Sequence, residues 1–291
     1  MGRVLSCVLP RVMYRVMPRV LPRVVLFMGV FVALCVGLLG APARAASPSI
    51  SLEDLTWTEL RDALRAGATT IIVPVGGTEQ NGPHMVLGKH NQRVRLLAGR
   101  IAGELGKTLV APVIAYVPEG RIAPPSGHMR FPGTISVPEA AFRGVLEGAV
   151  RSFRQAGFRD IVLLGDSGNY QSQLQSVATK LNREWTTSTT RVHFIAEYYR
   201  ATQGPYLQAL RDKGLSEAQI GTHAASADTS LLLALDPAGV RTDRLALADE
   251  ASSGVAGDPR AASAELGRAG VELIVARSVV AIRSGIAQPR R

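Results

Sequence analysis

Residues able to do acid–base or metal chemistry gather in one stretch, residues 71–91. The stretch begins with the apolar run Ile71–Val75, which is typical of a short buried strand, and Gly76-Gly77 then lets the backbone turn sharply. The loop that follows supplies a carboxylate, Glu79, and an imidazole, His90. Both groups bind divalent metals, and loops at the carboxyl ends of strands are where α/β proteins usually bind ligands. We therefore expect this loop to form part of a site.

Four residues further along the chain could complete such a site. His128 precedes a Phe-Pro-Gly-Thr turn, and Asp166 follows the apolar run Ile161–Leu164, while His223 and Asp228 precede another apolar segment. Each has a structural alternative. The histidines could be buried and hydrogen-bonded, Asp228 could cap the helix that follows it, and Asp166 could be a loop residue or a general base.

Four segments in order resemble the creatininase (creatinine amidohydrolase) family. The run PVGGTEQNGPH…LGKHN is similar to the family's PxGxxEQHGPHLPxxTD, and HMRFPGTISV (128–137), GFRDIVLLGDSGN (157–169) and HAASADTSLLLAL (223–235) are similar to its later motifs. The resemblance covers residues 55–270 or so. It implies a three-layer α/β/α sandwich with a mostly parallel central sheet, a homo-oligomer, and metal-dependent hydrolysis of a small amide or other non-peptide C–N bond.

The resemblance carries over to individual positions with several substitutions. Glu79 matches a metal-binding glutamate, but Asn81 stands where the family has a histidine, and His90 stands where it has the aspartate that bridges two metals. Aligned strand to strand, Ser167 falls on the histidine of the NGHGGN motif, and Asn169 falls on a glutamate ligand of creatininases proper.

These substitutions predict a single metal ion. We expect Glu79, His90 and Asp228, which matches the glutamate of the family's ET segment, to bind one Zn, Mn or Fe ion, because a neutral imidazole nitrogen cannot bridge two metals.

The resemblance implies a catalytic role for His223 on a small-molecule substrate and matches His128 to the family histidine before Phe-Pro-Gly-Thr, and we expect His128 and, as a general base, Asp166 to be further catalytic residues. Creatinine itself is not expected, since the family's GHYEN-type ligand is absent. The substitutions also support an alternative, a catalytically degenerate member that binds a small molecule or acts as an oligomeric structural protein.

Residues 1–45 predict a signal peptide. They hold six arginines and no acidic residue, an apolar run over residues 24–39, and the small-residue cleavage site Ala43-Arg44-Ala45. We expect cleavage near Ala46, a hydrolase domain over residues 46–291, and a periplasmic or secreted protein without a stable membrane span. An uncleaved anchor is the alternative, and Met13, Met17 or Met28 could be the true start.

The composition of the remaining chain excludes several classes of protein. Six of the 33 basic residues belong to residues 1–45, which leaves 27 basic against 23 acidic residues and no clustered basic patch that would indicate nucleic-acid binding. Both cysteines, Cys7 and Cys35, also lie in the leader. The mature protein would therefore have no disulfide, no thiolate metal site and no cysteine nucleophile.

Alternating apolar patterns predict an α/β domain. We expect strands at 70–75, 109–116, 161–164 and 192–198. We expect helices at 57–66, 93–105, 137–156, 171–185, 206–213 and 229–235, and one or two more beyond Pro259.

Overall fold

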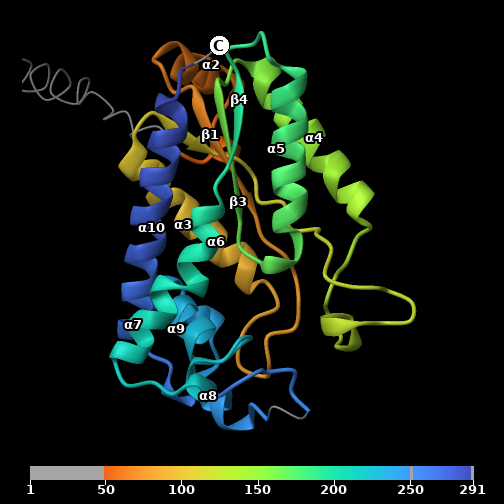
Figure 1. The fold of residues 1–291 in the computed structure, drawn as a ribbon, viewed down its shortest axis with the longest axis vertical. Helices are drawn as coiled ribbons and strands as arrows, with labels where there is room; N and C mark the ends of the chain where they lie inside the picture. Colours follow the sequence, from red (N-terminus) through yellow and green to blue (C-terminus); the bar gives the residue numbers. More distant parts are fainter. Residues whose placement is uncertain (1–48, 250–251, 290–291) are drawn as a thin grey trace, which may run out of the picture. The chain divides into compact units, whose positions relative to one another are not determined.

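The computed structural model describes residues 49–249 and 252–289 (Figure 1), so the predicted signal peptide lies outside the described residues. The helices are α2 (Trp57–Arg65), α3 (Lys89–Leu105), α4 (Glu139–Ala156), α5 (Gln171–Glu184), α6 (Ala196–Gln203), α7 (Pro205–Asp212), α8 (Glu217–Ile220), α9 (Ser226–Leu235) and α10 (Ala264–Ala287). Within the described part of the chain, no helix is both long and apolar enough to cross a membrane.

The centre of the domain is a four-stranded, all-parallel sheet in the order β2-β1-β3-β4. The strands are β1 (Thr70–Val75), β2 (Thr108–Val110), β3 (Asp160–Gly165) and β4 (Arg191–Phe194). β1 and β3 are in register along their whole length and are buried on both faces, which explains their continuous apolar sequences. The α/β class predicted from the sequence is confirmed.

Helices cover both faces of this sheet, which makes three layers (Figure 1). Ile71 and Ile161 face the layer formed by α4 and α5, whereas their neighbours Ile72 and Val162 face the layer that includes α3, α6 and α10. Successive strand residues point to opposite faces, so each inner strand contributes to both cores.

Two predicted strands are shorter in the structure. β2 ends at Val110 because Pro112 has no N–H to donate, and only an isolated bridge at Ile114 continues the pairing. β4 ends at Phe194, and α6 begins two residues later, at Ala196. The tail beyond Pro259 forms a short 3₁₀ turn and then one helix of 24 residues, α10.

The topology of the sheet determines where a site can form. β1 and β3 are neighbours, but the chain after β1 leads to α3 in one layer, while the chain after β3 leads to α5 in the other. Such a switch point leaves a crevice at the carboxyl ends of the strands, where open α/β sheets bind ligands.

A close backbone contact joins the end of β1 to the beginning of α3. The Oδ1 atom of Asn91 accepts the Gly77 N–H at 2.9 Å, and a Cβ atom on Gly76 would lie 2.1 Å from that same oxygen. Only glycine at position 76 allows this approach, which holds the first turn of α3 against the site loop.

Candidate active site

A cavity of about 240 Å³ opens at the carboxyl edge of the sheet. All six residues that the sequence singled out line it: Glu79, His90, His128, Asp166, His223 and Asp228. They come from segments spread over about 150 residues, and the switch point brings them together.

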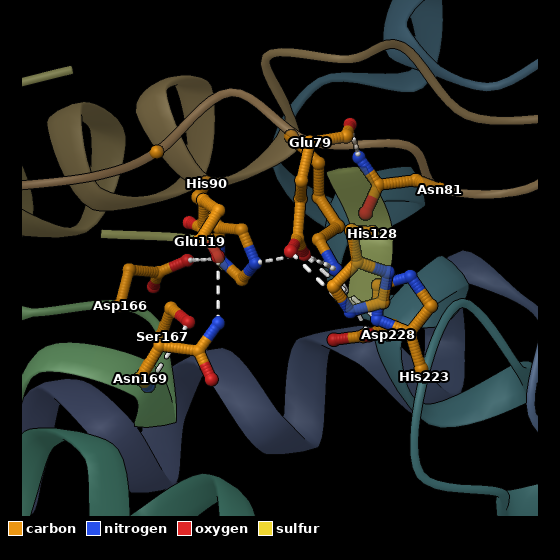
Figure 2. A network of polar contacts seen from close by, with 12 residues as sticks. Glu79, Asn81, His90, Glu119, His128, Asp166, Ser167, Asn169, His223 and Asp228 are labelled. Carbon is orange, nitrogen blue, oxygen red and sulfur yellow. Dashed lines mark hydrogen bonds and ion pairs between the residues drawn. The ribbon is translucent and has the colours of Figure 1, made fainter. Parts of the chain in front are cut away.

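His90 lies between two carboxylates (Figure 2). Its Nδ1 is 2.7 Å from Asp166 Oδ2 and its Nε2 is 2.8 Å from Glu79 Oε1. Burial and the charge of Lys89 lower the pKa of His90, but the two carboxylates outweigh them and raise that pKa above its usual value. Each ring nitrogen of His90 thus lies within hydrogen-bond distance of a carboxylate oxygen, and these contacts fix the orientation of the ring.

Asp228 is held by two cations of α3. Lys89 Nζ lies 3.0 Å from Asp228 Oδ2, and Arg93 Nη1 lies 2.8 Å from Oδ1. Burial would raise the pKa of Asp228, but Lys89 and Arg93 outweigh it and hold that pKa well below its usual range. Arg93 also donates from Nε to Asp166 Oδ2 at 2.8 Å, and so joins the two aspartates.

Glu79, His128 and His223 form a second group on the other side of the centre. Glu79 Oε2 lies 3.6 Å from His128 Nε2, and Glu79 Oε1 lies 3.8 Å from His223 Nδ1, while the two rings stack with centroids 4.2 Å apart. The potential ligand atoms of all three lie within 4.8 Å of one another. Two imidazoles and one carboxylate at such distances fit a single divalent ion.

Gln80 orients both of these histidines. The Nε2–H of His223 donates to the Gln80 backbone carbonyl at 3.0 Å, which leaves the lone pair of Nδ1, 3.8 Å from Glu79 Oε1, available to a metal ion. Burial and the Lys89 charge lower the pKa of His223 to about 4, so it is neutral at pH 7, as a metal ligand must be.

The Gln80 carboxamide donates to His128 Nδ1 at 2.8 Å, and its direction is fixed because its Oε1 accepts the Gly82 N–H. This contact puts the His128 proton on Nε2. Glu79 and His223 thus fit a metal as they stand, whereas His128 in this arrangement directs its Nε2–H toward Glu79 Oε2, 3.6 Å away.

Glu119 is a site residue that the sequence did not indicate. It lies in the loop between β2 and α4 and is only 4 % exposed, and its Oε2 accepts a hydrogen bond from Asn169 Nδ2 at 2.6 Å (Figure 2). Its Oε1 has no hydrogen-bond partner among the described residues. Burial and the neighbouring Glu79 charge raise the pKa of Glu119 to about 7. A second buried carboxyl group thus lies beside Asn169, at the edge of the centre.

The side chains of Asp166 and Ser167, which follow one another at the end of β3, make different contacts. Asp166 is buried and contacts His90, whereas the Ser167 hydroxyl accepts the Asn169 N–H and caps the short 3₁₀ helix η3 (Gly168–Tyr170). Asp166, and not Ser167, therefore takes the place that the strand-to-strand alignment expected for the NGHGGN histidine.

Asn81 has a structural role in this arrangement. Its Nδ2 donates to the carbonyls of Glu79 and Val86, which fixes the turn of the loop. The assignment of Glu79, His90 and Asp228 as ligands and of His223, Asp166 and His128 as catalytic groups stays a prediction. The geometry instead groups Glu79 with His128 and His223.

Lys89 and Arg93 were also missed by sequence reasoning. They are 0 % and 3 % exposed, although lysine and arginine are usually solvated. Their spacing of four residues could have indicated one helix face, and they lie on either side of His90 in sequence.

The fold and the site together define an α/β protein with a centre of carboxylates and imidazoles at the switch point of a parallel sheet. A model of the creatininase family, described as creatinine amidohydrolase, matches residues 53–282. The chain belongs to this family.

Its relatives include enzymes with different substrates. Creatinine amidohydrolase from Pseudomonas putida is 29 % identical over 205 residues, which cover 68 % of this chain and 76 % of that enzyme. A mycofactocin precursor peptide peptidase from Mycolicibacterium smegmatis is 30 % identical over 183 residues, covering 60 % of this chain and 61 % of the peptidase. A 3-dehydro-scyllo-inosose hydrolase from Thermotoga maritima is 26 % identical over 201 residues, covering 65 % of this chain and 57 % of that hydrolase. The last two are thus matched over less than two thirds of their length.

Solved creatininase structures share the fold. A mutant creatininase of Zn-Zn type superposes with a TM-score of 0.68 at 26 % identity, over 83 % of this chain and 100 % of that one. A manganese form gives 0.67 at 27 % identity, and a mutant complexed with creatine gives 0.67 at 25 % identity, each over 82 % of this chain and 100 % of the other.

Proposed function

We propose that this protein is an exported hydrolase of a small amide or other non-peptide C–N bond, and that it uses one divalent metal ion. The observation that carries the proposal is the group of Glu79, His128 and His223 inside the cavity at the sheet edge. Family membership supports hydrolysis, since the creatininase, peptidase and inosose hydrolase relatives all break bonds with water.

Glu79 and the two histidines would hold the metal ion. When bound, such an ion lowers the pKa of a water molecule toward about 7 and polarises the carbonyl group under attack. Among the chain's own residues, His90 donates to Glu79 Oε1 and so keeps Oε2 turned toward His128. Asp166 holds His90 in that orientation from the opposite side.

The cavity is small. It is polar near Glu79, His128 and His223, and another side of it is aromatic and aliphatic. Tyr199, Tyr206 and Leu207 line that side. A volume of about 240 Å³ suits a small molecule or the end of a larger one, with its polar bond toward Glu79 and its apolar part toward these residues.

Metal content and hydrolysis together test the proposal. Protein purified without chelator should hold about one ion per chain and should hydrolyse some members of a panel of cyclic amides and short peptides. Glu79→Gln should lower both metal affinity and activity at least roughly 100-fold, because a lost ligand costs no less than a lost supporting contact. Glu104→Gln, on the exposed part of α3, is the matched control and should change neither.

One observation favours a second candidate, a family member without catalysis that binds a small molecule. Lys89 and Arg93 balance the charge of Asp228, so this part of the centre is stable without a metal. A metal content near zero after gentle purification, together with no hydrolysis, would favour this candidate over the hydrolase.

A further inference from the structure

In one part of the site, the positive charges are those of two side chains of the protein, Lys89 and Arg93. Lys89 and Arg93 lie in the first turn of α3, both are buried, and each contacts one oxygen of Asp228, at 3.0 and 2.8 Å. Lys89 Nζ also lies 3.7 Å from Glu79 Oε1. Three carboxylates of the centre, counting Asp166 beside Arg93, therefore already have a positive neighbour.

Both oxygens of Asp166 accept hydrogen bonds from buried side chains. Its Oδ2 accepts from His90 Nδ1 at 2.7 Å and from Arg93 Nε at 2.8 Å, and its Oδ1 accepts from the Tyr198 hydroxyl at 2.6 Å. A carboxylate that binds a metal must give a lone pair to it, and here buried donors already use three of the roughly four lone-pair sites of Asp166.

The contact between His90 and Asp166 reverses the residue types of the family motifs. The motif similar to 74–91 has an aspartate at position 90, and NGHGGN, matched at its final Gly-Asn to residues 168–169, has a histidine at position 166. This chain keeps an acid–imidazole pair but exchanges its members. The exchange turns a bridging carboxylate into an imidazole whose two nitrogens both contact carboxylates.

We propose that Lys89 and Arg93 take the place of one of the two metal ions of the creatininase centre. The proposal rests on the proposed function only for the position of the remaining ion, which Glu79, His128 and His223 hold. An ion placed between Asp166 and Asp228 would meet an ammonium and a guanidinium group at hydrogen-bond distance from its own ligands, and like charges in a buried site repel strongly. The fixed cations therefore both satisfy these carboxylates and exclude a second ion.

The test counts metal ions in variants that lack the two cations. Wild-type protein and Lys89→Met/Arg93→Met are stripped with chelator, dialysed against excess Mn²⁺ or Zn²⁺, and analysed for bound metal. The double variant should bind about one ion per chain more than the wild type, because Asp166 and Asp228 then have free lone pairs. Arg95→Met/Lys213→Met removes the same residue types from exposed positions and should match the wild type.

A wild-type protein that binds two ions would overturn the proposal, as would a folded double variant with an unchanged count. If the double variant folds only with metal present, that requirement supports the proposal, since the ion then replaces the missing charge. If it folds in neither condition, Lys89→Gln/Arg93→Gln, which removes both charges but keeps amide donors for the two aspartates, is counted in its place, and an unchanged count again overturns the proposal.

The proposed function can fail separately from this inference. A wild-type protein with no metal and no hydrolysis would refute the metal-dependent hydrolase, yet a gain of one ion in the double variant would still support the role of Lys89 and Arg93. Conversely, an active enzyme with two ions would refute only the role of the two cations.

Discussion

At the scale of single residues, Asp166 links three buried side chains of the centre. It accepts hydrogen bonds from His90, Arg93 and Tyr198, and its neighbour Ser167 only caps a short helix. Removing the charge of Asp166 leaves Arg93 with only Asp228 and His90 with only Glu79 as carboxylate partners, and the loss of a buried charge partner is more costly than the loss of a neutral hydrogen bond.

Asp166→Asn should therefore lower the free energy of unfolding by about 3 kcal/mol, and Ser167→Ala should lower it by about 1 kcal/mol or less. Urea unfolding of both variants at pH 7 with chelator measures the difference. Equal effects would show that the network around His90 does not depend on the Asp166 charge.

The raised pKa of Glu119 predicts a pH dependence. Folding raises the pKa of this carboxyl to about 7, so the folded state binds its proton more tightly than the unfolded state does. The resulting stabilisation is full below the unfolded pKa of about 4.5 and is lost as the pH rises through about 7. The shift corresponds to a free energy on the order of 3 kcal/mol.

Glu119→Gln, which stays neutral and keeps an oxygen for Asn169, should lose this pH dependence. Urea unfolding at pH 5 and pH 8 in chelator is the measurement. The variant should gain stability relative to the wild type at pH 8 and not at pH 5. A wild type as stable at pH 8 as at pH 5, with Glu119→Gln unchanged, would contradict the raised pKa.

At the scale of elements, the layer behind the site depends on close contact between α9 and α10. A Cβ atom on Gly267 of α10 would lie 1.8 Å from the backbone oxygen of Ser230 in α9, so the two helices approach to backbone distance there. α9 carries Asp228, and the position of this helix therefore sets how Asp228 meets Lys89 and Arg93.

Gly267→Ala should destabilise the protein by about 3 kcal/mol, because the clash involves backbone that cannot move without shifting a helix. Gly148→Ala is the matched control in α4, where nothing lies within 4 Å of the new Cβ, and it should stabilise by about 0.5–1 kcal/mol. Thermal unfolding of the two variants tests this pair, and a harmless Gly267→Ala would mean that α9 and α10 are more loosely packed.

At the scale of the whole molecule, the sequence predicts processing and export. The arginine-rich start, the apolar run over residues 24–39 and Ala43-Arg44-Ala45 predict a mature chain that begins near Ala46. N-terminal sequencing of the protein from the periplasm or the medium is the measurement. A full-length product in the cytoplasm would refute export.

The sequence by itself determined the fold class, the inner strands and the family. The apolar runs at 71–75 and 161–164 form strands that are buried on both faces. A continuous apolar run of this kind can be recognised from the local sequence alone. The motifs also located all six candidate site residues in short segments next to strands or helices, and all six line the cavity.

Only the tertiary structure decided which atoms meet. At a strand end, a difference of one residue reverses the side that a side chain faces, so sequence alone could not choose between Asp166 and Ser167. Lysine, arginine and glutamate usually lie in solvent, and burial of Lys89, Arg93 and Glu119 depends on segments distant in sequence that supply their opposite charges or amide partners. Charge balance in this centre is a property of the folded chain, because it arises where the ends of β1 and β3 and the starts of α3 and α9 converge.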